Sequence, residues 1–224
     1  MLKKHWIFTR WNLLDAKTTI YNNPVIKDPE GWNQHRMKLF DTYCLPSVMN
    51  QTCRNFTWLL SFAPETPKSI IDKYITMPLV KIIFQYPADY VRSLYPEVLK
   101  NGDWIITSRL DNDDMIAPGY IEAIQNQFDD YFMLVDTDGC QLDLKTGKRY
   151  DPARRSNNSP FISLIEQVGA QWGEITDPVK TVYWCSHSKM ELHFPSIKID
   201  KRLYTMIIHD KNICNKIVGN ELRN

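Results

Sequence analysis

Three carboxylates within four residues form the part of this sequence best suited to chemistry. Asp111, Asp113 and Asp114, with Asn112 among them, follow the apolar run at residues 104–107. Neighbouring carboxylates repel one another, and a loop end tolerates this mainly when a cation or hydrogen-bond donors offset it. Ligand sets made of oxygen favour hard cations such as Mg²⁺ or Mn²⁺, which keep positions open for phosphate oxygens. The cluster therefore predicts a divalent metal site.

Two other interpretations of the cluster need weighing. An acidic turn whose aspartate caps the next helix is the plainer one, and it stays open on spacing alone. A calcium loop of the EF-hand type would use Asp111, Asp113 and Glu122 as its first, third and last ligands. Met115 and Ile116 stand where that loop needs an oxygen ligand and a glycine, so the pattern excludes it.

The cluster also stands at a favourable place among the expected elements. Apolar runs alternate with helical patterns, as in βαβ units that build a mostly parallel sheet, so we expect an α/β fold. Ligands bind outside the carboxyl ends of the strands in such sheets, where the run at 104–107 delivers the acidic residues. The expected strands are residues 5–9, 56–62, 80–84, 104–107, 131–135 and 181–184.

The helical patterns fill the spaces between those strands. A helix is expected over 32–43, where Arg36 recurs with apolar residues at helical spacing and Pro46 follows the end. Thr66 should cap a second helix, Pro118 should open a third, and a fourth should cover 161–168. The remaining stretches carry weaker patterns: 86–102 is unassigned, 139–160 resembles a hairpin with an exposed loop, and the C-terminal segment is polar.

Bulk properties limit the class of protein. The 224 residues, 43% of them hydrophobic, suit one domain over 1–224. The net charge of +1 gives no long-range field for nucleic acid, and no run approaches the roughly 18 apolar residues of a membrane span, although peripheral association stays open. No secretory signal is evident, and five scattered cysteines suit reduced thiols. We therefore expect a cytoplasmic protein.

Other common sites lack their motifs. Thr146-Gly147-Lys148 has no upstream glycine of a phosphate-binding P-loop, and no G-x-G-x-x-G follows a strand. A G-x-S-x-G elbow is absent as well, so a hydrolase triad has no starting point. Any nucleotide must be bound in another way.

At this point the sequence resembles the GT-A glycosyltransferases, in which a D-x-D element follows a strand, and more closely a family described as rhamnosyltransferases. The segment 109–114, Arg-Leu-Asp-Asn-Asp-Asp, is the most specific part of the likeness. The other similar segments span nearly the whole chain: 8–12, 39–48 with Gln51, 56–59, 161–166, 181–183 and 208–212.

The resemblance implies a nucleotide-diphosphate sugar donor, UDP- or dTDP-linked, and a Mn²⁺ or Mg²⁺ ion. Asp113 would ligate the metal and Asp111 would face the ribose or sugar. His209 resembles the late histidine that completes the metal site in many such enzymes. The nucleotide would lie against Thr9 and Arg10, at the end of the first expected strand, and Arg109 could neutralise a phosphate. For Thr9, Arg10 and Arg109, a hydrogen bond to the backbone or a surface ion pair remains an equal alternative.

The acceptor would be a saccharide, a glycan or another hydroxyl compound. An inverting reaction also needs a carboxylate base, for which Glu166 is the first candidate, with Glu174 and Glu191 left open. Trp172, Tyr183 and Trp184 could stack on an acceptor sugar or pack in the core. His187 and His193 are more simply solvated or capping residues, and His5 and His35 carry no signal.

Two further classes compete with a glycosyltransferase. One is a nucleotide-sugar or carbohydrate-binding module without turnover, which could dispense with Asp113 and His209. The other is a metal-dependent nucleotidyltransferase, which would usually carry a glycine-rich loop near its first strand, where residues 8–12 have no glycine.

Overall fold

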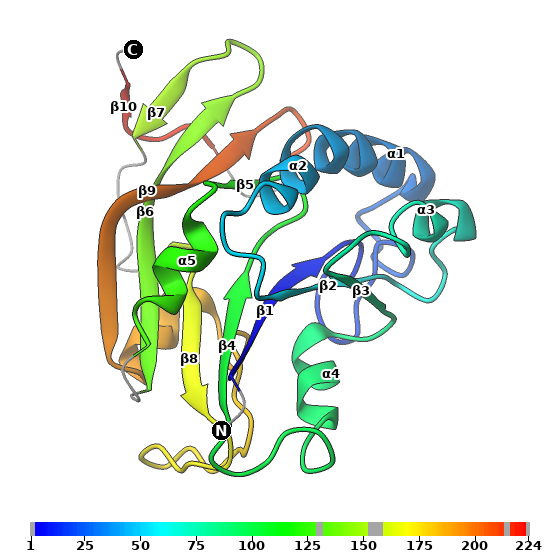
Figure 1. The fold of residues 1–224 in the computed structure, drawn as a ribbon. Coiled ribbons are helices and arrows are strands. Elements are labelled where there is room, and N and C mark those ends of the chain that lie inside the picture. Colours follow the sequence, from blue (N-terminus) through cyan, green and yellow to red (C-terminus); the bar gives the residue numbers. More distant parts are fainter. Residues whose placement is uncertain (1–2, 129–131, 152–158, 213–215, 223–224) are drawn as a thin grey trace.

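A twisted sheet of ten strands dominates the computed structural model, which describes residues 3–128, 132–151, 159–212 and 216–222 (Figure 1). Along one path the strands follow the order β10-β7-β6-β8-β4-β1-β2-β3, and β9 joins β6 to β5. Their bounds are β1 (Lys3–Arg10), β2 (Thr57–Ser61), β3 (Val80–Ile83), β4 (Trp104–Arg109), β5 (Met115–Ile116), β6 (Met133–Asp143), β7 (Arg149–Asp151), β8 (Ser163–Gln167), β9 (Ser196–Ile208) and β10 (Asn220–Glu221).

Short helices cover the sheet. In Figure 1, α1 and α2 lie at the end toward which β4 points, and α4 lies near the opposite end. The helices are α1 (Pro29–Leu39), a π-helix (Phe40–Cys44), α2 (Leu45–Met49), α3 (Lys68–Asp72), α4 (Pro87–Ser93), α5 (Tyr120–Gln125) and a 3₁₀ helix (His187–Leu192). No helix among the described residues is long and apolar enough to cross a membrane.

The N-terminal half of the sheet is parallel, as predicted. Strand β1 pairs in parallel with β2 on one side and with β4 on the other, and β2 continues in parallel to β3. The register sets Phe8 opposite Arg109, so the carboxyl ends of β1 and β4 lie side by side. The α/β prediction with a mostly parallel sheet is confirmed, and the acidic cluster leaves the sheet at the edge where a ligand crevice is expected.

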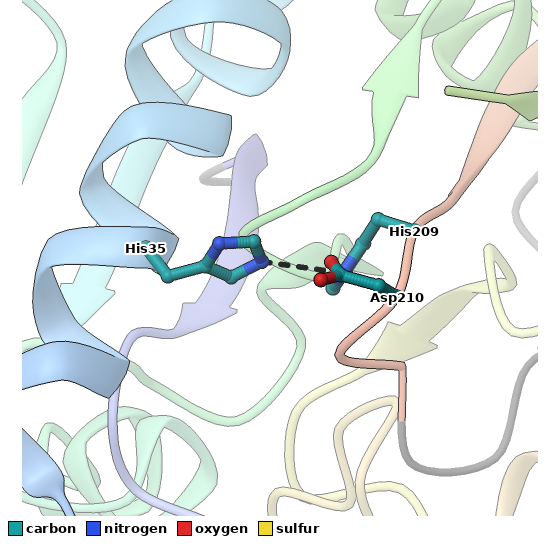
Figure 2. A group of neighbouring side chains, drawn as sticks. All are labelled: His35, His209 and Asp210. Carbon is teal, nitrogen blue, oxygen red and sulfur yellow. Dashed lines mark hydrogen bonds between the residues drawn. The ribbon is translucent and has the colours of Figure 1, made fainter. Parts of the chain in front are cut away.

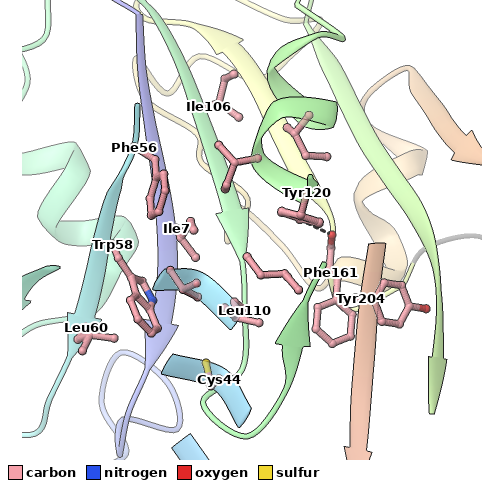
Figure 3. Close-up of a cluster of buried hydrophobic side chains, with 14 of the residues drawn as sticks. Ile7, Cys44, Phe56, Trp58, Leu60, Ile106, Leu110, Tyr120, Phe161 and Tyr204 are labelled. Carbon is pink, nitrogen blue, oxygen red and sulfur yellow. Dashed lines mark hydrogen bonds between the residues drawn. The ribbon is translucent and has the colours of Figure 1, made fainter. Parts of the chain in front are cut away.

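Successive residues of the central strands belong to two hydrophobic clusters. Ile7, Trp58 and Ile106 pack in one cluster, which Figure 3 shows together with Tyr120 of α5. Their neighbours Phe8, Leu59 and Ile105 pack in the other. Because side chains alternate across a strand, a strand covered on both faces must be apolar at nearly every position. This explains the continuous apolar runs in the sequence.

The first helix is longer than the predicted 32–43. Asp28 accepts a hydrogen bond from the backbone N–H of Gly31 and starts the helix at Pro29. The helical path then continues through Pro46 to Met49, whereas the sequence suggested an end before Pro46. The five residues before α2 form a π-helix in which Leu45 N–H bonds to the Phe40 carbonyl. We attribute this wider turn to Pro46, which has no N–H to donate and crowds the preceding turn.

Three expectations for the C-terminal half are wrong. Within residues 161–168 the chain forms strand β8 (Ser163–Gln167) and no helix, because the short apolar run lies buried between β4 and β6. A run of this length cannot be assigned by periodicity alone. Residues 181–184 form turns instead of a strand, with Thr181 at φ +67°. The polar C-terminal segment contains β9, the longest strand described, whose first half alternates exposed and half-buried residues.

Smaller differences concern loops and caps. The Thr66 hydroxyl does not cap α3, since it donates to the Ala63 carbonyl and accepts from the Asn12 amide. Helix α4 lies within the unassigned segment 86–102. The hairpin in 139–160 is confirmed as β6 and β7, but β6 runs on through Gly139, where a Cβ would lie 2.3 Å from the Tyr204 ring. Residues 131 and 152–158 of the expected strand and loop fall outside the described residues.

Candidate active site

A cavity of about 450 Å³ opens where β1 and β4 end. Arg10 from β1, Arg109 from the end of β4, and Asp111 and Asp113 from the loop beyond it line this space. Helix α1 contributes Trp32 and Arg36 from above. We call this space the rim cavity. It brings together four of the predicted site residues in one place that a ligand could enter.

The two carboxylates in the rim cavity are each paired with an arginine. Asp111, whose side chain is one-third exposed, accepts from Arg109 Nη2 at 3.1 Å. Burial opposes ionisation of Asp111 most strongly, yet Arg109 and Arg10 together lower its carboxyl pKa. Asp113 is nearly buried and forms an ion pair with Arg36. Both carboxylates are therefore paired with cationic side chains.

The other two residues of the cluster fix its shape. The Asn112 amide donates to the Trp11 carbonyl at 2.6 Å and accepts from Arg36 at 3.2 Å. Asp114 is buried and accepts from the backbone N–H of Ile207 at 2.7 Å, which ties the cluster to β9. Burial, followed by the neighbouring carboxylates Asp113 and Asp111, raises the pKa of Asp114 well above its ordinary value. These two side chains hold the loop in its shape, although Asn112 also lines the rim cavity.

Two arginines in the rim cavity keep unused donors. The Nε atoms of Arg10 and Arg109 are buried and have no hydrogen-bond partner among the described residues. Both guanidinium groups lie near the ring of Tyr183, at 5.4 Å and 5.9 Å from its centroid. A buried donor without a partner costs free energy that an anionic ligand would recover. The pair thus suits a phosphate-bearing ligand.

His209 contacts Asp113 from outside the rim cavity, since it lines a neighbouring cavity. Its Nε2 lies 3.0 Å from Asp113 Oδ2, and the side chain is only 3% exposed. Strand β9 brings it there, because β9 pairs with β5 directly after the cluster. On the other side of the ring, Nδ1 lies 3.2 Å from His35 Nε2. The sequence placed Asp113 and His209 in one site, and the structure brings them into contact.

Two other predicted site residues, Thr9 and Glu166, do not line the rim cavity either. The Thr9 hydroxyl donates to the Leu110 carbonyl and accepts from the Trp58 indole, both at 2.9 Å, and so holds β1 against the chain that enters the cluster. Glu166 is fully buried on β8, and its two carboxylate oxygens accept the backbone N–H groups of Lys180 and Thr181. Neither residue has a free polar atom for a ligand, because these bonds engage the groups that would bind it.

The structure adds Arg36, His187 and His35 to the residues around the site. Arg36 lies in an apolar helical stripe. An arginine at such a position is rarely buried without a partner, and here the partner is Asp113. His187 lines the rim cavity and its Nδ1 lies 3.1 Å from Arg109 Nη1, although it was taken for a solvated residue. Burial, and then Arg109, lowers the His187 pKa. His35 carried no signal because only the fold sets it beside His209.

The aromatic residues considered for the acceptor lie outside the rim cavity. Tyr183 packs on Phe8 and Tyr86 beneath the two arginines. Trp172 and Trp184 line a separate cavity, together with His193. Since 181–184 is no strand, the expected alternation of Tyr183 and Trp184 is lost, and of the three aromatics none is among the residues that line the rim cavity.

Together, the mostly parallel α/β sheet and the acidic cluster at its rim have the architecture expected of the GT-A class. Residues 22–221 match the model of a family described as "Putative rhamnosyl transferase". The chain belongs to this family. Among curated proteins, no sequence matches the chain.

One solved structure agrees with the fold assignment. A crystal structure of S. aureus TarS, residues 1–349, is similar with a TM-score of 0.50 at 11% identity, over 91% of this chain and 60% of that one. The chain thus spans less than two-thirds of the TarS structure. The same TarS segment in complex with UDP gives a TM-score of 0.49 at 12% identity, over 92% and 60%. The inositol-1-phosphate CTP transferase from T. maritima gives 0.40 at 13%, over 92% and 90%.

Proposed function

We propose that this chain is a metal-dependent glycosyltransferase that moves a sugar from a nucleotide-diphosphate sugar to a saccharide or other hydroxyl acceptor. Its family suggests rhamnose as the sugar. A cytoplasmic location belongs to the same proposal, because nucleotide-sugars of this kind would be met there. The donor would be UDP- or dTDP-linked, and the acceptor could also lie on a membrane surface.

One observation carries the proposal: two carboxylates and two arginines with unused Nε donors face the same cavity at the carboxyl end of β4. A nucleoside diphosphate has two anionic phosphates that can bind a metal ion on one side and guanidinium groups on the other. Asp111 and Asp113 suit the ion, and Arg10 and Arg109 suit the phosphate oxygens. Asp111 is also open enough to meet a ribose or sugar hydroxyl.

The donor set fits Mn²⁺ or Mg²⁺. Two neighbouring ligands of an octahedral ion at about 2.1 Å lie roughly 3.0 Å apart, and His209 Nε2 lies 3.0 Å from Asp113 Oδ2. Arg36 pairs with the same oxygen and would have to turn away to the Asn112 amide, to which it already donates. A bound ion supplies Lewis-acid stabilisation of the leaving diphosphate.

The remaining steps use residues of this chain. As the bond from the anomeric carbon to the diphosphate oxygen breaks, negative charge grows on the diphosphate, where Arg10 and Arg109 can stabilise it. The ring of Tyr183 lies within cation–π distance of both guanidinium groups. Glu166 is not retained as the acceptor's base, since backbone N–H groups engage both of its oxygens.

Screening donors tests the proposal directly. Purified protein would be incubated with UDP-, dTDP- and GDP-sugars, with Mn²⁺, Mg²⁺ or EDTA, and release of the nucleoside diphosphate would be measured with and without saccharide acceptors. We expect release from one donor class that depends on the metal and is lost in Asp113→Ala. Tight metal-dependent donor binding without release under any condition would instead indicate a binding module, and release unaffected by EDTA would refute the metal's role.

A further inference from the structure

We propose that His35, His209 and Asp210 form a second metal site that takes Zn²⁺ or a similar transition-metal ion, on the side of His209 turned away from Asp113. Figure 2 shows His35 on α1 pointing toward His209 and Asp210, which follow β9. The three residues come from two segments that are far apart in the sequence and meet only in the fold. This site goes beyond the proposed transfer reaction.

The distances suit a transition-metal ion. His35 Nε2 and His209 Nδ1 lie 3.2 Å apart, and one ligand atom from each of the three residues lies within 4.8 Å of the others. Two imidazole nitrogens bound to tetrahedral zinc at about 2.0–2.1 Å stand roughly 3.4 Å apart. The two rings would therefore need to move only slightly to bind one ion between them. Two histidines and one carboxylate form a ligand set that zinc accepts.

The hydrogen bonds of His209 place the lone pair of the ring on Nδ1, the nitrogen that faces His35. The backbone N–H of Lys211 donates to His209 Nδ1 at 3.2 Å, and a backbone N–H can only donate. In this tautomer Nδ1 carries the lone pair and the proton on Nε2 is donated to Asp113 Oδ2 at 3.0 Å, while the Asn212 amide nitrogen lies 3.2 Å from the same Nε2. A histidine that binds a metal usually gives its other N–H to a carboxylate in this manner. Asp113 would then orient the ligand without touching the ion.

The site has room for an ion and its water. His35, His209 and Asp210 line a cavity of about 640 Å³, together with Lys38 and Tyr43. None of the residues that line this cavity lines the rim cavity. Asp210 is exposed and can turn toward the two rings, whereas the nearly buried His209 is fixed. Three protein ligands leave the fourth position of a tetrahedral ion open to solvent.

Occupation of this site has a consequence for the proposed transfer reaction. A neutral imidazole offers one lone pair, so His209 cannot bind zinc through Nδ1 and manganese through Nε2 at the same time. Zinc at His35 would remove one ligand from the ion proposed at Asp113. If the proposed function holds, the two metal states exclude each other.

Calorimetric titration of the full chain with Zn²⁺ tests the inference. We expect one high-affinity ion per chain, and at least 100-fold weaker binding in His35→Ala. His193→Ala, a change of an exposed histidine far from the cluster, is the matched control and should bind as the unchanged protein does. Asp113→Asn keeps all three ligands and should weaken binding about 10- to 100-fold by loss of the orienting carboxylate. Equal zinc affinity in His35→Ala and the unchanged protein would overturn the site.

Two further measurements keep the outcomes separable. His35→Gln, checked by its melting temperature, guards against misfolding of the alanine variant and should also lose the zinc. Binding of Mn²⁺ with UDP, followed by paramagnetic resonance, should survive His35→Ala and be lost in Asp113→Ala. Loss of zinc binding alone supports the second site, whereas absence of Mn²⁺–UDP binding in the unchanged protein would refute the proposed function and leave the zinc result standing.

Discussion

Two regions of this molecule bury carboxylates, and they do so in different ways. At the rim cavity, Asp111 and Asp113 are neutralised by Arg109 and Arg36. Within the sheet, Glu166 is satisfied by two backbone N–H groups. The adjacent Lys180, also buried, donates its ammonium to the carbonyls of Ala170 and Asp177.

The partners decide what each carboxylate can do. A guanidinium group sits on a flexible side chain and can yield its position to a metal ion or a phosphate. A backbone N–H is fixed by the fold, and losing its acceptor leaves a buried donor unsatisfied. The rim carboxylates are thus exchangeable and suited to ligands, whereas Glu166 is a structural anchor for residues 180–181. The following predictions test this contrast, from the largest expected effect to the smallest.

Asp113→Ala should abolish metal-dependent donor turnover while the protein stays folded. The ion's stabilisation of the leaving group is worth several kcal/mol, so kcat/KM should fall by about 1000-fold, or roughly 4 kcal/mol. The assay is metal-dependent release of nucleoside diphosphate. Asp72→Ala removes an exposed carboxylate paired only with Lys68 and should leave turnover unchanged. A similar rate in Asp113→Ala and Asp72→Ala would contradict the role given to Asp113.

Glu166→Ala should act on stability instead. It leaves the backbone N–H groups of Lys180 and Thr181 unsatisfied in a buried place, at a cost of about 1–3 kcal/mol each. We expect the free energy of unfolding, measured by urea denaturation, to fall by about 2–6 kcal/mol in total. The turnover number of the folded fraction should persist. A large loss of kcat with unchanged stability would restore Glu166 as a candidate base.

Arg109→Lys should weaken binding of the nucleotide-sugar donor without unfolding the chain. Lysine keeps the charge but loses the planar group that reaches both Asp111 and His187, and it offers no equivalent of the unused Nε. We expect the dissociation constant for the nucleoside diphosphate to rise about tenfold, or roughly 1.4 kcal/mol, by calorimetry. Arg202→Lys, on the exposed part of β9, is the matched control. Unchanged affinity in Arg109→Lys would place the phosphates elsewhere.

The smallest expected effect is a pH dependence at Glu166. Burial raises its carboxyl pKa above the ordinary 4.5, against the opposing influence of the N–H groups of Lys180 and Thr181. A raised pKa in the folded state means that folding favours the protonated form, so this contribution is complete below pH 4.5 and declines as the pH rises through the folded pKa.

Urea denaturation of the unchanged protein and of Glu166→Gln should be compared from pH 4.5 upward. The difference between the two isolates the contribution of Glu166, because the other titrating groups contribute equally to both proteins. The stability of the unchanged protein relative to the variant should decrease with rising pH and then level off. A difference that increases with pH would show that the N–H groups outweigh burial.

Sequence reasoning succeeded where a pattern was local. The continuous apolar runs of β1, β2 and β4 gave correct strands, because a strand covered on both faces is apolar at nearly every position. It failed at β8, where a five-residue apolar strand resembles a piece of helix, and at β9, whose exposed first half looks like a polar tail. In both cases the pairing strands, which come from distant parts of the chain, decided the conformation.

The candidate site shows the same division. By itself, the sequence determined that Asp111 and Asp113 follow a buried strand. The apolar run and the three carboxylates that come after it are both local features of the chain. Only the tertiary structure decided that Arg36 and His35 of one helix turn to opposite sides of His209, and that Glu166 has no free oxygen. Charge and spacing along the chain fix which groups are available, but hydrogen bonds between segments 100 or so residues apart fix which of them remain free for a ligand.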